Sequence, residues 1–107
     1  MQKILLTALF AASIGAVAAP VNSEDAAFAT ALAALEKHQL TSLKTECLFF
    51  DAGEEGDNYQ INVHEKHDAS CGGDPNTAPR LFTLTVAKAD GKVSVDDPVS
   101  SETRVLE

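Results

Sequence analysis

The stretch NYQINVHE, Asn58–Glu65, alternates apolar and polar side chains, and so does RLFTLTVA, Arg80–Ala87. This alternation predicts two β-strands that each bury one face. If the strands pair antiparallel with Glu65 opposite Arg80, all their central apolar residues face one another. The expected pairs are Val63–Phe82, Ile61–Leu84 and Tyr59–Val86. A slip of one residue would turn a whole strand over, so this agreement predicts both pairing and register.

Two further strands are expected beside this pair. SLKTECLFF, 42–50, comes before it. Apolar residues occupy both faces of this strand, with Leu48 and Phe50 on one and Cys47 and Phe49 on the other, so the sequence does not decide which face points inward. KVSVD, 92–96, follows a turn at Asp90-Gly91, which would set Val93 against Val86 and Val95 against Leu84. Between the first two strands, DAGEEGDN, 51–58, reads as a flexible charged connection. Its acids do not follow the alternating ligand pattern of a calcium loop.

A single helix is predicted ahead of the strands. Asn22 and Ser23 are capping residues, and two acids follow them, where the helix dipole favours negative charge. Apolar residues then recur at spacings of three and four up to Leu35, which predicts one buried stripe, and the helix closes at Lys37 and His38. The fold class is therefore α+β: one N-terminal helix packed on a four-stranded antiparallel meander, with one disulfide.

The chain divides into three parts. Residues 1–18 carry one early lysine, an apolar run and then small residues, the pattern of a secretory signal peptide that is removed after Ala18. Residues 19–97 are expected to form one small domain. Residues 98–107 are expected to lie outside it as a C-terminal tail, either disordered or completing a sheet edge. The apolar run is short for a bilayer span, so no stable membrane anchor is expected.

The two cysteines are expected to form a structural disulfide. An exported protein meets an oxidising compartment, so Cys47 and Cys71 are predicted to pair. A redox role would call for a Cys-x-x-Cys spacing, which the sequence does not contain. The predicted location is the periplasm, or the extracellular space where the cell has no outer membrane.

Charge restricts the class of partner. The whole chain has a formal charge of −8, and loss of Lys3 with the signal peptide leaves 16 acids and 7 bases, or −9. Such a surface repels phosphates and anionic lipids, so no nucleic acid is expected as partner. A cationic protein is the partner that the charge favours, although acidity also serves solubility. The sequence does not indicate the oligomeric state.

The stretch CGGDPNTAPR, 71–80, is the main candidate for a binding element. It lies in a connection of fourteen residues, 66–79, which is long for so small a domain, and long loops often carry function. An alternative is a covalently pinned connection with an ion pair between Glu65 and Arg80 at the end of the sheet. The candidate partner-binding residues are Glu54, Asp57, Asp74, Asn76 and Arg80.

A second candidate is a metal site in HEKHD, 64–68. His64, His67 and Asp68 offer two imidazoles and a carboxylate, a set that suits zinc or copper. On a strand His64 points away from Glu65 and His67, so convergence would need a bend after Glu65. Solvated loop histidines are the alternative, and no cofactor is expected.

The function that the sequence favours is a small exported protein-binding module, such as an inhibitor or immunity-type protein against a cationic envelope partner. A periplasmic metal-binding protein and a structural envelope protein are the alternatives. Catalysis is not expected, because the known nucleophile, zinc-protease and phosphate-loop motifs are missing from the sequence. The order of helix and strands is similar to that of small secreted folds of the cystatin-like or PepSY-like kind, a likeness of architecture only.

Overall fold

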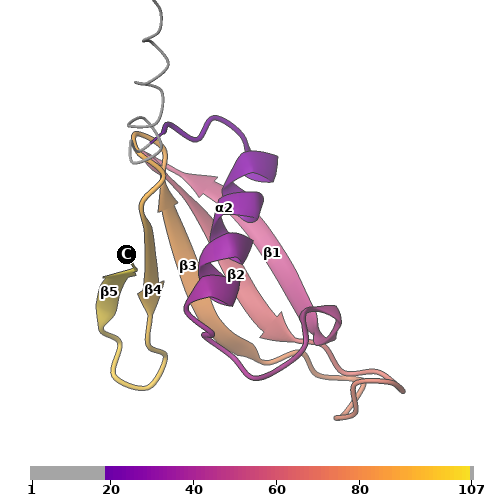
Figure 1. The fold of residues 1–107 in the computed structure, drawn as a ribbon. Helices are drawn as coiled ribbons and strands as arrows, with labels where there is room; N and C mark the ends of the chain where they lie inside the picture. The colour runs from indigo at the N-terminus through magenta and orange to yellow at the C-terminus, as the bar shows by residue number, and fades with distance from the viewer. Residues whose placement is uncertain (1–18, 107) are drawn as a thin grey trace, which may run out of the picture.

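The computed structural model describes residues 19–106, which form one α-helix and one antiparallel sheet of five strands (Figure 1). The strands lie in the order β1-β2-β3-β4-β5, so each pairs with its neighbour in the sequence. The predicted α+β meander with one helix and one disulfide is confirmed, but the sheet has five strands and not four. The predicted signal peptide, residues 1–18, lies outside the described residues.

Helix α2, Glu24–Lys37, begins and ends as its capping residues predict. The Ser23 hydroxyl accepts a hydrogen bond of 3.1 Å from the Ala26 N–H, which satisfies one of the free donors of the first turn. The residues buried against the sheet are Ala27, Ala31 and Leu35. Two of these are alanines, and such short side chains let a helix backbone lie close to a sheet.

Strand β1, Leu48–Glu55, lies later in the chain than predicted. Residues Thr45–Cys47 form a turn of 3-10 helix, η2, so the strand begins only at Leu48. Its inward side chains include Leu48, which is buried, and Phe50, whose ring meets Phe28 edge-on at 5.0 Å between centroids. The prediction that residues 51–58 form a flexible connection is wrong, because β1 continues to Glu55. Asp51, Glu54 and Glu55 belong to the strand because their backbone pairs with β2.

Strands β2, Asn58–Glu65, β3, Arg80–Ala87, and β4, Val93–Asp96, pair in the predicted register. The three apolar pairs expected between β2 and β3 are all present, and so are Val86–Val93 and Leu84–Val95 between β3 and β4. Burial follows the same alternation, because Ile61, Val63, Leu84 and Val86 are each fully buried. The apolar pattern of these strands was sufficient to predict their alignment.

The end of the β2–β3 pair differs from the prediction. A bulge after Val63 places His64, and not Glu65, opposite Arg80, so Leu81 is left without a partner in the ladder. The predicted ion pair between Glu65 and Arg80 is not formed. Arg80 instead contacts Asp96 on β4, with 3.1 Å between Nη1 and Oδ2.

Strand β5, Thr103–Leu106, is the fifth strand, so the C-terminal tail follows the second of its two expected alternatives and completes an edge of the sheet. It pairs with β4 so that Leu106 faces Val93, and Leu106 is only 7% exposed. The turn before β5 is held by Asp97, whose Oδ1 accepts hydrogen bonds from the N–H groups of Val99 at 2.8 Å and Ser100 at 3.4 Å. These bonds hold the pKa of Asp97 below its ordinary value. The described domain therefore extends to residue 106.

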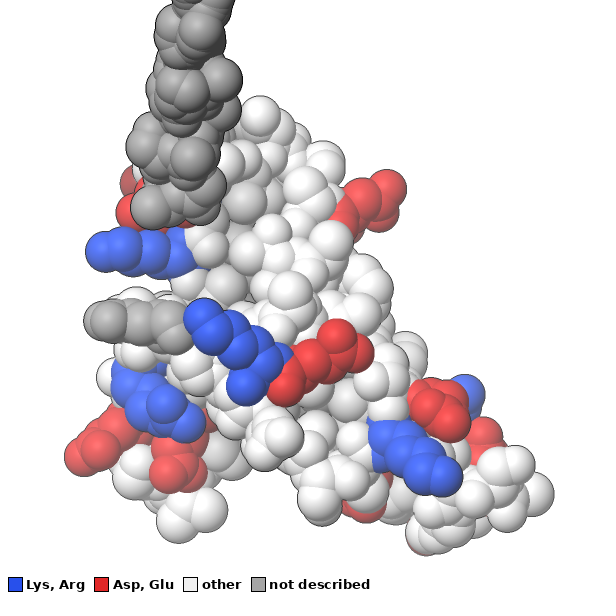
Figure 2. Space-filling model, in the orientation of Figure 1, with Lys and Arg blue, Asp and Glu red and all other residues white. Residues whose placement is uncertain are grey.

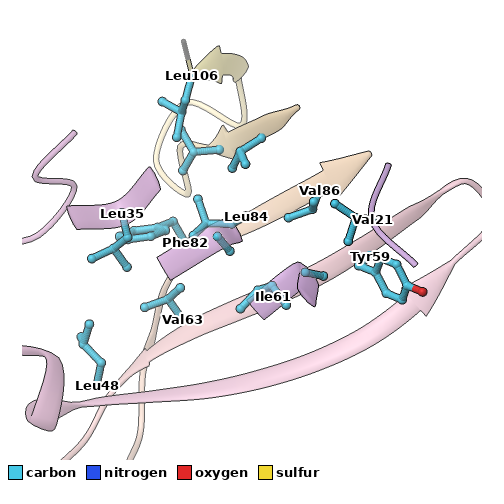
Figure 3. Packing of buried hydrophobic residues seen from close by; sticks show 14 residues of the cluster. Val21, Leu35, Leu48, Tyr59, Ile61, Val63, Phe82, Leu84, Val86 and Leu106 are labelled. Atoms are coloured by element: carbon cyan, nitrogen blue, oxygen red, sulfur yellow. The ribbon is translucent and has the colours of Figure 1, made fainter. Parts of the chain in front are cut away.

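The core lies between α2 and one face of the sheet (Figure 3). Tyr59 and Val86 lie toward one end of it and Leu48 toward the other, with Ile61 and Leu84 between them. The opposite face of the sheet carries mostly neutral polar residues at intermediate exposure: Asn58, Gln60, Asn62, Thr83, Thr85 and Ser94. The domain thus has two layers, and only one face of its sheet is covered by a described element.

Candidate functional site

The connection between β2 and β3, residues 66–79, is the most prominent irregular part of the described structure, and we call it the stapled loop. It extends beyond the end of the sheet (Figure 1), and every residue of 72–80 is exposed. The predicted disulfide is present and joins Cys71 of the loop to Cys47 at the start of β1. The loop is therefore both exposed and covalently attached to the sheet.

His67 lies inside the stapled loop. Its side chain is only 12% exposed, and its Nδ1–H donates to the carbonyl oxygen of Asp74 at 2.9 Å and lies 3.0 Å from the Thr77 hydroxyl. On the other side of the ring, Nε2 lies 3.4 Å from the Glu65 carboxylate. The bond to the Asp74 carbonyl, helped by Glu65, raises the pKa of His67 above its ordinary value. The imidazole thus connects the two halves of the loop.

Gly73 packs directly on the His67 ring. A methyl group built on Gly73 would lie 2.4 Å from the ring carbon Cδ2, and its φ of +84° lies in the left-handed region. Glycine is the residue that adopts this angle without steric cost. Gly72 has a similar φ of +81°, but a methyl group there would contact nothing within 4 Å. Of these two loop glycines, Gly73 is therefore the one needed for both conformation and packing.

Two aspartates hold the backbone of the stapled loop from within. Asp68 Oδ1 accepts from the N–H groups of Ser70 at 3.0 Å and Cys71 at 2.8 Å. Asp74 Oδ1 accepts from the Asn76 N–H at 3.0 Å, and the Asp74 carbonyl also receives the Thr77 N–H at 3.0 Å. Carboxylates that bond to the backbone two residues ahead form tight turns. The two turns and the imidazole give the loop a single internally bonded shape.

The five candidate partner-binding residues lie at two opposite ends of the sheet. Asp74, Asn76 and Arg80 are at or beside the stapled loop, whereas Glu54 and Asp57 are at the β1–β2 turn. The eight-residue strands between them span roughly 25 Å. Three of the five side chains have partners already, since Glu54 forms an ion pair with Lys88, Arg80 forms one with Asp96, and Asp74 accepts from a backbone N–H of the loop. The structure does not bring the set together as one site.

The three candidate metal ligands also serve other contacts. His64 Nδ1 donates to the Ala78 carbonyl at 2.8 Å, His67 is held inside the loop, and Asp68 bonds to the backbone. Within residues 19–106, no group of three histidine, cysteine, aspartate or glutamate side chains is arranged to hold a metal ion. The structure places these residues near one another in the chain but does not turn them toward one centre.

Two features of the site could not be found by reading the sequence. One is the network around Asp96, which accepts from the Thr83 N–H at 2.6 Å as well as from Arg80. The other is an open cleft of about 280 Å³ beside the β4–β5 hairpin, with Leu40, Phe82 and Val95 among its lining residues. The cleft depends on β5 and its turn, which the alternation of residues 98–107 is too short to predict. The Asp96 network depends on the bulge that shifts Arg80 at the end of the sheet.

Charge is dispersed over the face of the molecule that carries α2. Figure 2 shows lysine and arginine side chains interspersed with aspartate and glutamate on that face, without a large patch of one sign. In the described residues no helix has the length and apolar character needed to cross a membrane. Comparison of the chain with protein-family models, curated proteins and solved structures gave no match.

Proposed function

We propose that this chain is a small exported acidic protein-binding module that contacts its partner through the stapled loop, as an inhibitor or immunity-type protein would. The observation that carries the proposal is that the loop is exposed from Gly72 to Pro79 and yet fixed from inside. A loop that is ordered before binding loses little conformational entropy in the complex, so more of the contact energy appears as affinity.

Export is part of the same proposal. It is supported by the signal-peptide pattern of residues 1–18 and by a disulfide, which persists in oxidising compartments. The net charge of −8 favours a cationic partner, and we expect that partner to be in the cell envelope or the surrounding medium. We propose a role in binding and not in catalysis, since the loop uses its own acids and His67 to hold its backbone.

The proposal is tested with the oxidised protein of residues 19–107 immobilised and exposed to envelope and secreted fractions. The decisive variant is Asn76→Arg, because Asn76 is exposed and its backbone N–H, not its side chain, makes the bond to Asp74. Asn22→Arg is the matched control, since Asn22 is also exposed but lies before α2. We expect a stoichiometric partner that salt elutes, that Asn76→Arg loses and that Asn22→Arg keeps. A partner that both variants retain equally would refute the loop as the contact.

The metal-binding alternative has a test of its own. It predicts zinc or copper affinity in the micromolar range or tighter that His67→Ala removes. Calorimetric titration of the oxidised protein measures it, with His38→Ala as the control because His38 caps α2, away from the loop. A flat titration excludes the alternative and leaves the binding module as the function to pursue.

A further inference from the structure

The free edge of β1 is the second surface that the structure exposes for contact. β1 is the outermost strand of the sheet and pairs with β2, and among residues 19–106 no strand lies along its other edge (Figure 1). Nothing in the described residues forms a backbone hydrogen bond with that edge between Phe49 and Glu55. An unpaired edge of eight residues is a template on which another extended chain can pair.

The register identifies which backbone groups face outward. Lys66 N–H donates to the carbonyl of Cys47 at 2.9 Å, so this opposed pair is hydrogen-bonded. Hydrogen-bonded and non-hydrogen-bonded pairs alternate in an antiparallel ladder. The residues of β1 that are bonded to β2 are therefore the odd-numbered ones. Those that present both N–H and C=O to the free edge are Phe50, Ala52 and Glu54, whereas the Leu48 N–H already donates to the Thr45 carbonyl.

The middle of this edge has small residues, and no neighbouring part of the chain packs closely enough there to require them. A methyl group built on Gly53 would meet nothing within 4 Å, and its φ is not in the left-handed region. Glycine weakens a strand, and within a strand it often marks a place where another backbone comes close. Its neighbour Ala52 is also small and is exposed on the other face. Both faces of the edge are open at its centre.

Acidic side chains line the same edge. Asp51, Glu54 and Glu55 of β1 and Asp57 of the following turn are all exposed. Of these four carboxylates, Glu54 has an ion-pair partner, Lys88, and the other three have none among the described residues. A second copy is a poor occupant, because antiparallel pairing of two β1 strands would bring these acids together, and like charges across a pair are destabilising. A basic strand would instead be attracted.

We propose that the β1 edge binds an extended, lysine- or arginine-bearing segment of a partner protein by strand addition. The bound segment pairs with the backbone at Phe50, Ala52 and Glu54, and its cationic side chains lie near Asp51, Glu55 and Asp57. This site is separate from the stapled loop and does not rest on it. A partner that does not contact the stapled loop can still bind at the β1 edge. Failure of one proposal therefore does not refute the other.

The direct test uses a synthetic octapeptide that alternates lysine and threonine, with a glutamate–threonine octapeptide as control, and amide hydrogen exchange as the readout. We expect exchange to slow at least tenfold for the N–H groups of Phe50, Ala52 and Glu54. The N–H groups of Asp51 and Gly53 already bond to β2 and should change little. Protection without this alternation, equal effects of both peptides, or no binding at millimolar peptide would overturn the proposal.

Variants test the backbone and the charge separately. Ala52→Pro removes one outward N–H and leaves the bonds to β2 intact, so we expect at least tenfold weaker peptide binding, whereas Ala52→Ser should bind as the parent does. Preserved β2–β3 resonances show that the proline variant is folded.

Charge reversal by Asp51→Lys with Glu55→Lys should also abolish binding. Its control is Glu36→Lys with Glu102→Lys, which changes the net charge equally at two exposed acids away from this edge. Equal loss of binding in both double variants would mean that net charge alone attracts the peptide, and the edge would be excluded as its site.

Discussion

At the scale of single residues, His67 and Gly73 determine the shape of the stapled loop. The ring of His67 is bonded on one side to the Asp74 carbonyl and lies on the other side near Glu65, while Gly73 closes over it. A side chain in such a position acts as the core of the loop, although it is polar and titratable. The histidine that the sequence suggested as a metal ligand is therefore used to hold the loop together.

Gly73→Ala should destabilise the protein more than Gly72→Ala does. Both substitutions place a side chain at a φ above +80°, which costs about 1–2 kcal/mol, but only the first adds a clash with the His67 ring. Urea denaturation of the two variants measures the difference. Equal losses of unfolding free energy would show that the ring moves aside without cost.

The stability of the protein should fall as pH rises through the range where His67 titrates. The pKa of His67 is raised in the folded protein above 6.5, the ordinary value, so folding favours the protonated ring. The resulting stabilisation is fully present below pH 6.5 and is lost as pH rises through the raised folded value. Denaturation at a series of pH values should show this decline in the parent and not in His67→Gln. A decline of equal size in the variant would assign it to other groups.

At the scale of elements, β5 determines how far the core extends. Its four residues place Leu106 beside Val93 and complete one wall of the cleft near Leu40. The strand is short, and its outward residue Val105 is 54% exposed, so its stability comes from one buried leucine and from pairing with β4. Such an edge strand depends on few contacts.

Leu106→Ala should therefore cost about 2–3 kcal/mol of unfolding free energy, the usual loss for a buried leucine. Val105→Ala is the matched control on the same strand and should change stability by less than about 0.5 kcal/mol. Thermal and urea unfolding measure both variants. If Leu106→Ala behaves like Val105→Ala, β5 contributes nothing to the core in solution.

The sequence predicts the elements that bury one apolar face. It does not predict the elements whose conformation depends on contacts with distant parts of the chain. The strands β2, β3 and β4 and helix α2 have apolar periodicities that burial explains, and their register followed from them. Residues 51–55 have no apolar alternation that would predict a strand. They form one because their backbone pairs with β2.

The candidate site was predicted in part. The loop and its disulfide were recognisable from glycine, proline and cysteine, but its internal bonds to His67 and Asp68 were not. Asp96 contacts Arg80 because a bulge shifted the end of the sheet, and a single extra residue of this kind leaves no clear mark in the sequence.

At the scale of the whole molecule, the disulfide joins the start of the sheet to the loop at its end. Cys47 follows the connection from α2, and Cys71 lies 24 residues later, so the bridge encloses β1, β2 and half of the stapled loop. A domain this small gains a large share of its stability from such a link. The link also restricts the unfolded chain, which no contact in the folded state can do.

Replacing both cysteines by serine should lower the unfolding free energy by about 3–4 kcal/mol, the chain-entropy value for a loop of this length. We expect the loop amides 72–78 to exchange faster, whereas the amides of β3 and β4 should keep their relative order of protection. Urea denaturation and hydrogen exchange of Cys47→Ser with Cys71→Ser measure both effects. A loss below about 1 kcal/mol would mean that the loop is ordered by its hydrogen bonds alone.

The order of strands in the sheet also bears on how the protein is made. Since β1 to β5 occupy the sheet in the order in which they occur in the chain, each strand after β1 pairs with the strand just before it in the sequence. Neighbouring pairings of this kind close short loops, which favours rapid folding. The disulfide needs only residues up to 71, so it can close around the β1–β2 hairpin before β3 pairs with β2. The first hairpin can thus be held closed while the C-terminal half of the sheet is still assembling.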